Sequence, residues 1–236
     1  MAAWQRGILM AMALAAGVLI GCAWRSCQLA PKPEYFSEPY AQIGERAAAA
    51  AAALSGGKKS KRVVLLTGAA GFVGFHTALQ LHSGGDTVLG LDNFNHYYDV
   101  RLKRARARLL RSARDQGGAQ LELVEGDVCD SALLQLLLRE GKITNVIHLA
   151  AQAGVRYSLK NPLAYVEANV KCFVTMLEAV HAVNNSIPIV YASSSSVYGM
   201  NKVIPFSERH QVDTQASLYG ATKKSNENIA HVYHCL

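Results

Sequence analysis

The feature that most constrains the fold is a set of three glycines placed directly after a short apolar run. Residues 63–66 are all valine or leucine, and Gly68, Gly71 and Gly74 follow at intervals of three. A strand that turns tightly into a helix needs glycine where the chain bends and where helix and strand lie close together. The N–H groups at the start of such a helix bind anions. The pattern therefore predicts a strand, a phosphate-binding turn and a helix.

The same alternation of apolar runs and helical periods continues along the chain. Runs rich in β-branched residues predict strands, and stretches with apolar residues three or four apart predict helices. The predicted strands are 63–66, 87–91, 121–124, 145–149 and 187–191, and the predicted helices are 72–83, 98–114, 131–140 and 162–183. Continuously apolar strands joined by helices indicate a parallel sheet covered on both faces, the doubly wound α/β (Rossmann) architecture.

The region before this pattern predicts an anchor and a spacer. Residues 7–24 are uncharged and mostly apolar, which at about 1.5 Å per residue is just enough to cross a bilayer. We therefore expect a membrane anchor at 1–25, a stalk rich in proline, alanine and glycine at 26–61, and the folded domain at 62–236. A cleaved signal peptide is the main alternative for the first segment, and residues 19–22 also resemble a lipoprotein cleavage box.

Charge and cysteine content exclude some classes of protein. The net charge is +7, and basic residues gather at 58–62 and 101–114, which we interpret as the opening of a folded domain after a linker and as one solvated helix. No aromatic pattern accompanies them, so we expect no nucleic-acid partner. The five cysteines lack the close paired spacing of metal or redox motifs, so neither a metal site nor a disulfide framework is expected. Cys129, Cys172 and Cys235 are interpreted as small apolar fillers.

Acidic residues at two strand ends complete the signature of a dinucleotide site. Asp92 ends the second predicted strand, 18 residues after Gly74, where a carboxylate would accept hydrogen bonds from a ribose 2′-hydroxyl. It would also repel a 2′-phosphate, so NAD is expected rather than NADP. Gly126, Asp127 and Val128 follow the third strand, where a loop would pass the adenine, although an ordinary turn is an equal alternative.

A tyrosine and a lysine after the fifth strand carry the predicted chemistry. Tyr219 and Lys223 are four residues apart and share one helix face. A cation about 4 Å from the phenol, at an effective dielectric near 20, contributes about 4 kcal/mol, enough to lower a phenol pKa from about 10 to about 7. The serine run at 193–196 offers a hydroxyl that could share the substrate's proton. We therefore predict a base, its cationic partner and an assisting serine.

Taken together, residues 62–236 resemble the extended short-chain dehydrogenase/reductases of the NAD-dependent epimerase/dehydratase family. Residues 91–99, 148–156 and 193–199 are most similar to UDP-glucuronate 4-epimerases. The resemblance implies that Tyr219 is the base, Lys223 its partner and Ser194 the assisting hydroxyl. It implies substrate contacts for Ser194, Ser195, Ser196 and Arg156. It implies NAD contacts for Tyr219 and Lys223 and for Gly68, Gly71, Phe72, Val73, Gly74, Asp92, Asn93, Asp127, Val128, Leu149, Ala150, Ala151 and Asn169.

The implied reaction is NAD-dependent C4 epimerisation of UDP-glucuronate to UDP-galacturonate through a 4-keto intermediate. Related dehydratases and decarboxylases carry a glutamate at the position of Ser196, which favours epimerisation here. UDP-galactose 4-epimerase, UDP-glucuronate decarboxylase and a non-catalytic nucleotide-fold protein remain alternatives. The resemblance also implies a homodimer at full length and a single-pass type II Golgi membrane protein.

The end of the chain and the roles of two residues, His148 and Arg156, require separate expectations. The family's substrate domain comes largely from residues beyond the catalytic helix, so we expect most of it to lie outside this chain and the chain alone to be inactive. His148, at a strand end, is either catalytic or a satisfied core histidine. Arg156 either pairs a substrate anion or forms a surface ion pair.

Overall fold

The computed structural model describes residues 45, 49, 62–113 and 119–235. The predicted anchor and almost all of the predicted stalk lie outside these residues. Within the described part of the chain, no helix is long and apolar enough to cross a membrane.

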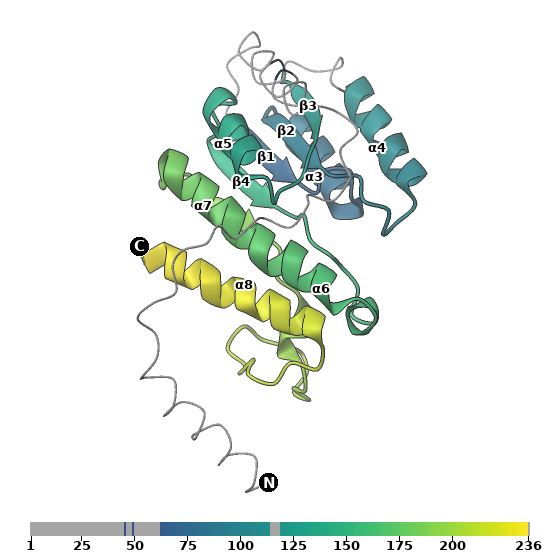
Figure 1. Ribbon diagram of the computed structural model, residues 1–236, viewed down its shortest axis with the longest axis vertical. Helices are drawn as coiled ribbons and strands as arrows, with labels where there is room; N and C mark the ends of the chain where they lie inside the picture. The colour runs from purple at the N-terminus through teal and green to yellow at the C-terminus, as the bar shows by residue number, and fades with distance from the viewer. Residues whose placement is uncertain (1–44, 46–48, 50–61, 114–118, 236) are drawn as a thin grey trace, which may run out of the picture. The chain divides into compact units, whose positions relative to one another are not determined.

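A five-stranded parallel sheet forms the centre of the folded unit (Figure 1). Its strands are β1 Val63–Thr67, β2 Thr87–Asp92, β3 Leu121–Glu125, β4 Asn145–His148 and β5 Ile189–Tyr191. Their order is β3-β2-β1-β4-β5, and Val64 of β1 pairs with Val88 on one side and Asn145 on the other. The chain therefore grows outward in one direction from β1 and then reverses at β4, which creates a topological switch point between β1 and β4 where ligands of such sheets bind.

Helices cover both faces of the sheet, which confirms the predicted doubly wound fold. On one face α3 (Phe72–Ser83) and α4 (Val100–Ala113) bury Phe75, Ala78 and Leu110 against β1, β2 and β3. On the other face α5 (Ser131–Glu140) and α7 (Cys172–Asn184) bury Leu134 and Phe173. The last helix, α8 (Leu218–Cys235), runs beside α7 (Figure 1).

One predicted helix differs from the observed structure. The stretch expected as a single helix at 162–183 consists of α6 (Pro162–Tyr165), a π-helical segment η4 (Val166–Lys171) and α7. Short 3-10 segments, η3 (Tyr157–Leu159) and η5 (Ser195–Tyr198), flank this part of the chain. Strand β5 begins after Pro188 rather than before it, because proline has no N–H to donate to a ladder.

The expectation that residues 101–114 form one solvated helix is wrong for Lys103. The Lys103 side chain is buried, because Lys103, Ala107 and Leu110 share the face of α4 that packs on the sheet. The Arg104 guanidinium donates two 2.6 Å hydrogen bonds to the Glu125 carboxylate, and Arg106 Nη1 donates to the Ala70 carbonyl at 3.4 Å. The basic stripe is therefore partly structural.

Candidate active site

The glycine turn lies between the end of β1 and the start of α3. Gly68 has φ +73°, and a Cβ there would lie 2.8 Å from the Ala150 backbone nitrogen. A Cβ on Gly74 would lie 2.1 Å from the Gly68 carbonyl oxygen, so no other residue fits without moving the backbone. Gly71 precedes the first turn of α3, where Phe72 and Val73 are exposed. The turn is therefore tight, glycine-dependent and open to solvent at the helix N-terminus.

The Asp92 carboxylate is held directly beneath this turn. Its Oδ2 accepts a hydrogen bond from the Ala70 N–H at 3.0 Å, and its Oδ1 accepts one from the Phe94 N–H at 2.8 Å. Lys103 Nζ lies 3.2 Å from Oδ1, and both side chains are buried. Asp92 thus has a fixed orientation and its own counter-ion. Sequence reasoning missed Lys103, although its position on the face of α4 shared with Ala107 and Leu110 was a usable signal.

Asn93 and Asp127, both expected to contact NAD, contact each other. Asn93 Nδ2 donates to Asp127 Oδ2 at 3.0 Å, and Asp127 Oδ1 accepts from the Cys129 N–H at 2.8 Å. Val128, which lies between Asp127 and Cys129, is buried in the core beside α5. The loops after β2 and β3 are therefore joined at the carboxyl edge of the sheet.

The ends of β1 and β4 are connected through Thr67. Its hydroxyl oxygen accepts from the Ala150 N–H at 3.2 Å and lies 2.9 Å from His148 Nδ1, while its carbonyl accepts from the Leu149 N–H. Burial, together with the nearby positive charge of Lys223, lowers the pKa of His148 to about 3. His148 is therefore neutral and holds the switch point together, which agrees with its interpretation as a satisfied core histidine.

Asn169 connects the loop after β4 with the last helix. Its Oδ1 accepts from the Gln152 N–H at 2.7 Å, and its Nδ2 donates to the Gln152 carbonyl and to Thr222 Oγ1, both at 3.1 Å. Asn226 Nδ2 donates to the Asn169 carbonyl at 2.6 Å. The side chain is 2 % exposed. Asn169 therefore positions neighbouring backbone, including that next to Ala151, and helix α8.

Helix α8 presents the predicted tyrosine–lysine pair. Lys223 is buried, and its Nζ donates to the Ala192 carbonyl at 2.9 Å, just after β5. Because burial penalises the ammonium form, the pKa of Lys223 falls to about 8. Tyr219 is partly buried, and its ring packs edge-on against Tyr165 with centroids 6.1 Å apart. The amine therefore lies at the carboxyl edge of the sheet, close to the switch point.

The serine run forms a turn that seats the start of α8. Ser194 Oγ accepts from the Ser196 N–H at 3.2 Å, and Ser195 is exposed. Ser193 Oγ donates to Glu227 Oε1 at 2.6 Å, a contact that sequence reasoning missed. A Cβ on Gly220 would lie 2.6 Å from the Ser196 carbonyl oxygen, so the glycine beside Tyr219 allows helix and turn to approach closely.

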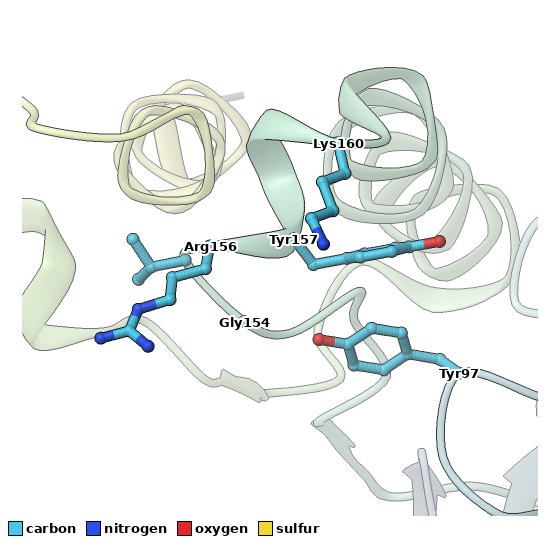
Figure 2. A pocket seen from close by; sticks show the side chains of 6 residues that line it. Tyr97, Gly154, Arg156, Tyr157 and Lys160 are labelled. Atoms are coloured by element: carbon cyan, nitrogen blue, oxygen red, sulfur yellow. The ribbon is translucent and has the colours of Figure 1, made fainter.

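Arg156 lies in a pocket of about 430 Å³ beside these elements. The rings of Tyr97 and Tyr157 are 5.0 Å apart, and in Figure 2 Arg156 extends away from them while Lys160 lies on their side. The pocket is lined by Tyr97, Gly154, Val155, Arg156, Tyr157 and Lys160. Two cations and two aromatic rings make this pocket suited to an anionic ligand with a flat or ring-shaped part. Of these residues, only Arg156 was expected from the sequence.

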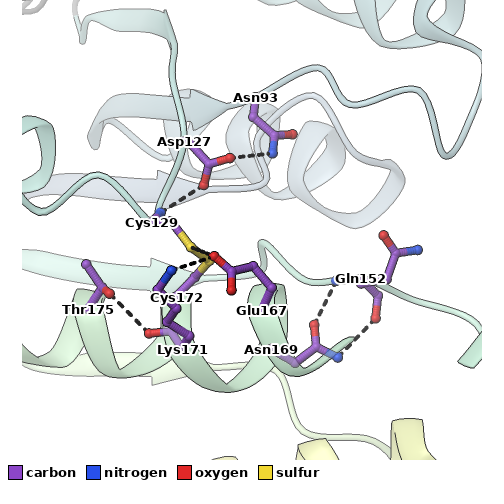
Figure 3. The surroundings of a disulfide bond; sticks show 9 residues. All are labelled: Asn93, Asp127, Cys129, Gln152, Glu167, Asn169, Lys171, Cys172 and Thr175. Carbon is purple, nitrogen blue, oxygen red and sulfur yellow. Dashed lines mark hydrogen bonds and ion pairs between the residues drawn. A yellow bond between two sulfur atoms is a disulfide. The ribbon is translucent and has the colours of Figure 1, made fainter. Parts of the chain in front are cut away.

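The interpretation of Cys129 and Cys172 as apolar fillers is wrong. Their sulfurs form a disulfide across 43 residues of sequence, with the Cα atoms 4.4 Å apart (Figure 3). The bond escaped prediction because the two cysteines are distant in sequence and meet only when α5 and α7 pack on the same face of the sheet. Asp127 lies close enough to form a potential metal-binding group with them, but sulfurs joined in a disulfide cannot act as thiolate ligands.

Comparisons with known proteins agree with this geometry. UDP-glucuronate 4-epimerases 6 and 3 of Arabidopsis thaliana are each 54% identical to the chain over 171 residues, which is 72% of this chain but 36% and 38% of those proteins. The resemblance to UDP-glucuronate 4-epimerases is therefore confirmed. The chain spans little more than a third of the length of these curated relatives.

Solved structures show the same fold in related enzymes. A UDP-glucuronic acid 4-epimerase from Bacillus cereus, in complex with UDP-glucuronic acid and NAD, superposes with a TM-score of 0.64 at 33% identity, covering 73% of this chain and 52% of that chain. A UDP-glucose 4-epimerase from Bifidobacterium longum, in complex with NAD+ and UDP, gives 0.63 at 30% identity, covering 73% and 49%. The family model described as GDP-mannose 4,6 dehydratase matches residues 65–236. The chain therefore belongs to the GDP-mannose 4,6 dehydratase family.

Proposed function

We propose that this chain carries the cofactor-binding part of an NAD-dependent 4-epimerase that converts UDP-glucuronate to UDP-galacturonate. The observation that carries the proposal is the placement of Lys223, on the helix face shared with Tyr219, at the carboxyl edge of the sheet. The names of the Arabidopsis relatives and of the Bacillus cereus enzyme support the choice of substrate.

The residues around the switch point fit a dinucleotide. Gly68 and Gly74 allow the turn to pack tightly on neighbouring backbone, and the N-terminus of α3, whose N–H groups can bind a pyrophosphate, begins at the same turn. We assign Asp92 to the adenosine ribose, and Asn93, Asp127 and Val128 to the adenine side. Leu149, Ala150, Ala151 and Asn169 complete the site around the nicotinamide half. When bound, NAD supplies a reversible hydride acceptor.

Proton transfer is assigned to Tyr219, which takes the proton from the sugar 4-hydroxyl. With a pKa of about 8, Lys223 remains mostly an ammonium at neutral pH, so the face of α8 that it shares with Tyr219 carries a positive charge. Ser194, held by its own turn, supplies a hydroxyl that can share the same proton. Return of the hydride to the opposite face of C4, and of the proton to the C4 oxygen, would invert the centre.

Substrate contacts are assigned to the serine turn and to Arg156. Ser194, Ser195 and Ser196 offer hydroxyl groups to the sugar and its carboxylate, and Arg156 offers a cation to the carboxylate or the diphosphate. Because Ser196 has no carboxylate to serve a second proton transfer, epimerisation is favoured over dehydration or decarboxylation.

We also propose that residues 7–24 anchor the protein in a Golgi membrane as a single-pass type II protein, and that the full-length protein is a homodimer. The uncharged apolar run at 7–24 supports the anchor. Alkaline extraction of membranes from expressing cells should leave the protein in the pellet, and its release would contradict the anchor. Light scattering of the detergent-solubilised protein should give twice the chain mass, and a monomer mass would contradict the dimer.

The test of the function is to incubate full-length protein with UDP-glucuronate and resolve the products. UDP-galacturonate should appear, and Tyr219→Phe should lower the turnover rate by about 100-fold or more. Tyr233→Phe makes the same change on the same helix and should leave turnover intact. Release of carbon dioxide would identify a decarboxylase, and turnover of UDP-galactose alone a different epimerase. NAD binding without any turnover would indicate a non-catalytic protein, and each of these results contradicts the proposal.

A further inference from the structure

The Cys129–Cys172 disulfide joins two segments that border the proposed cofactor site. Cys129 lies in the loop between β3 and α5, and Cys172 is the first residue of α7 (Figure 3). Cys172 is buried in the core between the sheet and α7, whereas Cys129 is partly exposed. The bond therefore fixes a surface loop to a helix that is itself rigidly packed.

On the loop side, the disulfide lies two residues from Asp127. The Cys129 N–H donates to Asp127 Oδ1 at 2.8 Å, and the other carboxylate oxygen accepts from Asn93 Nδ2 at 3.0 Å. Any shift of the Cys129 backbone would therefore turn the Asp127 carboxylate and disturb Asn93. These are residues that the proposed function assigns to the adenine side of NAD.

On the helix side, the disulfide lies three residues from Asn169. Asn169 holds both backbone groups of Gln152, in the loop after β4, and its carbonyl accepts from Asn226 of α8. Lys171 pairs with Glu167 at 2.7 Å on the exposed side of the same helical segment. The crosslink thus connects the adenine-side loop to the residue that positions the nicotinamide-side loop.

From this placement we propose that the Cys129–Cys172 disulfide is a positioning crosslink for the adenosine end of the dinucleotide site, so that its reduction weakens NAD binding. The inference rests on the proposed function, because it takes Asn93 and Asp127 as cofactor contacts. Without the bond, the loop at residues 126–130 must be ordered by NAD itself. Ordering the backbone of one residue costs about as much free energy as a tenfold change in a dissociation constant.

The redox step requires only an external dithiol. One thiolate of the dithiol attacks the partly exposed Cys129 sulfur, the S–S bond breaks, and Cys172 leaves as a thiolate that takes up a proton. The second thiol of the reagent then displaces Cys129. The protein gains two electrons and two protons as two thiols, and the reagent becomes a cyclic disulfide.

The experiment measures the NAD dissociation constant of full-length protein by calorimetry before and after treatment with dithiothreitol. Alkylation and peptide mass mapping establish which cysteines are paired in each sample. Reduction should raise the dissociation constant by about tenfold, and removal of the reagent in air should restore it. Cys129→Ser/Cys172→Ser should bind like the reduced protein and no longer respond to the reagent. Cys235→Ser removes the exposed free thiol found among the described residues and should behave like wild type.

Several outcomes would overturn the proposal. An unchanged dissociation constant in protein that mapping shows to be fully reduced would mean that the bond is only structural, even if the thermal midpoint falls. The same conclusion would follow if Cys235→Ser lost the response. Because reduction is applied to the wild-type chain, the test stands even if the double variant does not fold. Protein that binds no NAD in either state would instead contradict the proposed cofactor site, and the two failures are therefore distinguishable.

Discussion

Replacing Lys223 by methionine should remove a pH dependence of stability that the wild-type protein shows in mildly alkaline solution. The Lys223 side chain is 4 % exposed, and burial lowers its pKa from 10.5 to about 8. The unfolded chain therefore binds more protons than the folded chain between these two values. As a result, wild-type stability rises with pH through this interval, and below it the folded state bears the full penalty of a buried ammonium.

The size of this effect follows from the two pKa values. Each pKa unit corresponds to about 1.4 kcal/mol, so a fall from 10.5 to about 8 penalises the folded state by about 3 kcal/mol at pH 7. At pH 10 less than 1 kcal/mol remains, by the same linkage relation. The free energy of unfolding of wild type, relative to that of Lys223→Met, should therefore increase by about 2.5 kcal/mol between pH 7 and pH 10.

The assay is urea unfolding followed by circular dichroism at several pH values, with the two proteins compared at each one. Other titrating groups are common to both chains and largely cancel in the difference. Thr222→Val is the matched control, because Thr222 is a buried neighbour on α8 that does not titrate. Its difference from wild type should be constant with pH. If the Lys223→Met difference is also constant from pH 7 to pH 10, the buried ammonium on which the argument depends does not exist.

Three further predictions concern stability. Gly74→Ala should lower the free energy of unfolding in urea by about 1–3 kcal/mol, because the new Cβ would lie 2.1 Å from a carbonyl oxygen. Gly84→Ala, whose Cβ would have no contact under 3.4 Å, should change the free energy of unfolding by less than about 1 kcal/mol, and equal effects of the two substitutions would contradict the steric argument. His148→Gln should make the free energy of unfolding less sensitive to acid, because the pKa of His148 is about 3 in the folded chain and 6.5 in the unfolded chain. The free energy of unfolding of wild type should therefore fall by about 2 kcal/mol relative to that of the variant between pH 7 and pH 5, and an equal dependence on pH in the two proteins would refute this. Reducing the Cys129–Cys172 bond, which closes a loop of 43 residues, should lower the free energy of unfolding by up to about 4 kcal/mol, and an unchanged denaturation midpoint would exclude the crosslink.

The fold could be predicted from the sequence because its signals are local. The apolar run at residues 63–66 and the glycines that follow Thr67 are enough to predict a strand, a turn and a helix without information from distant residues. The observed limits of the strands differ from the predicted limits by only a few residues, as where Pro188 directly precedes β5. The doubly wound order follows from the alternation of strands and helices.

The site was less predictable, because its contacts join residues far apart in the chain. Asp92 was recognisable from its distance to the glycines, but the helical spacing that places Lys103 on the inward face of α4 does not show which carboxylate it meets. The pairing of Cys129 with Cys172 depends on how α5 and α7 pack, which no spacing rule encodes. The role of Asn169 as a connector between the loop after β4 and helix α8 likewise appears only when α8 is in place.

The π-helical segment at Val166–Lys171 makes this helical stretch respond differently to the loss and to the gain of a residue. A π-turn contains one residue more than an α-turn, so removal of one of these six residues would allow ordinary winding to resume while the residues downstream keep their rotation about the helix axis. Insertion of a further residue would instead rotate everything downstream by about 100°. Phe173 and Met176 would then turn away from the sheet that they now cover, and Cys172 would leave its partner. We expect this stretch to tolerate the loss of one residue far better than the gain of one.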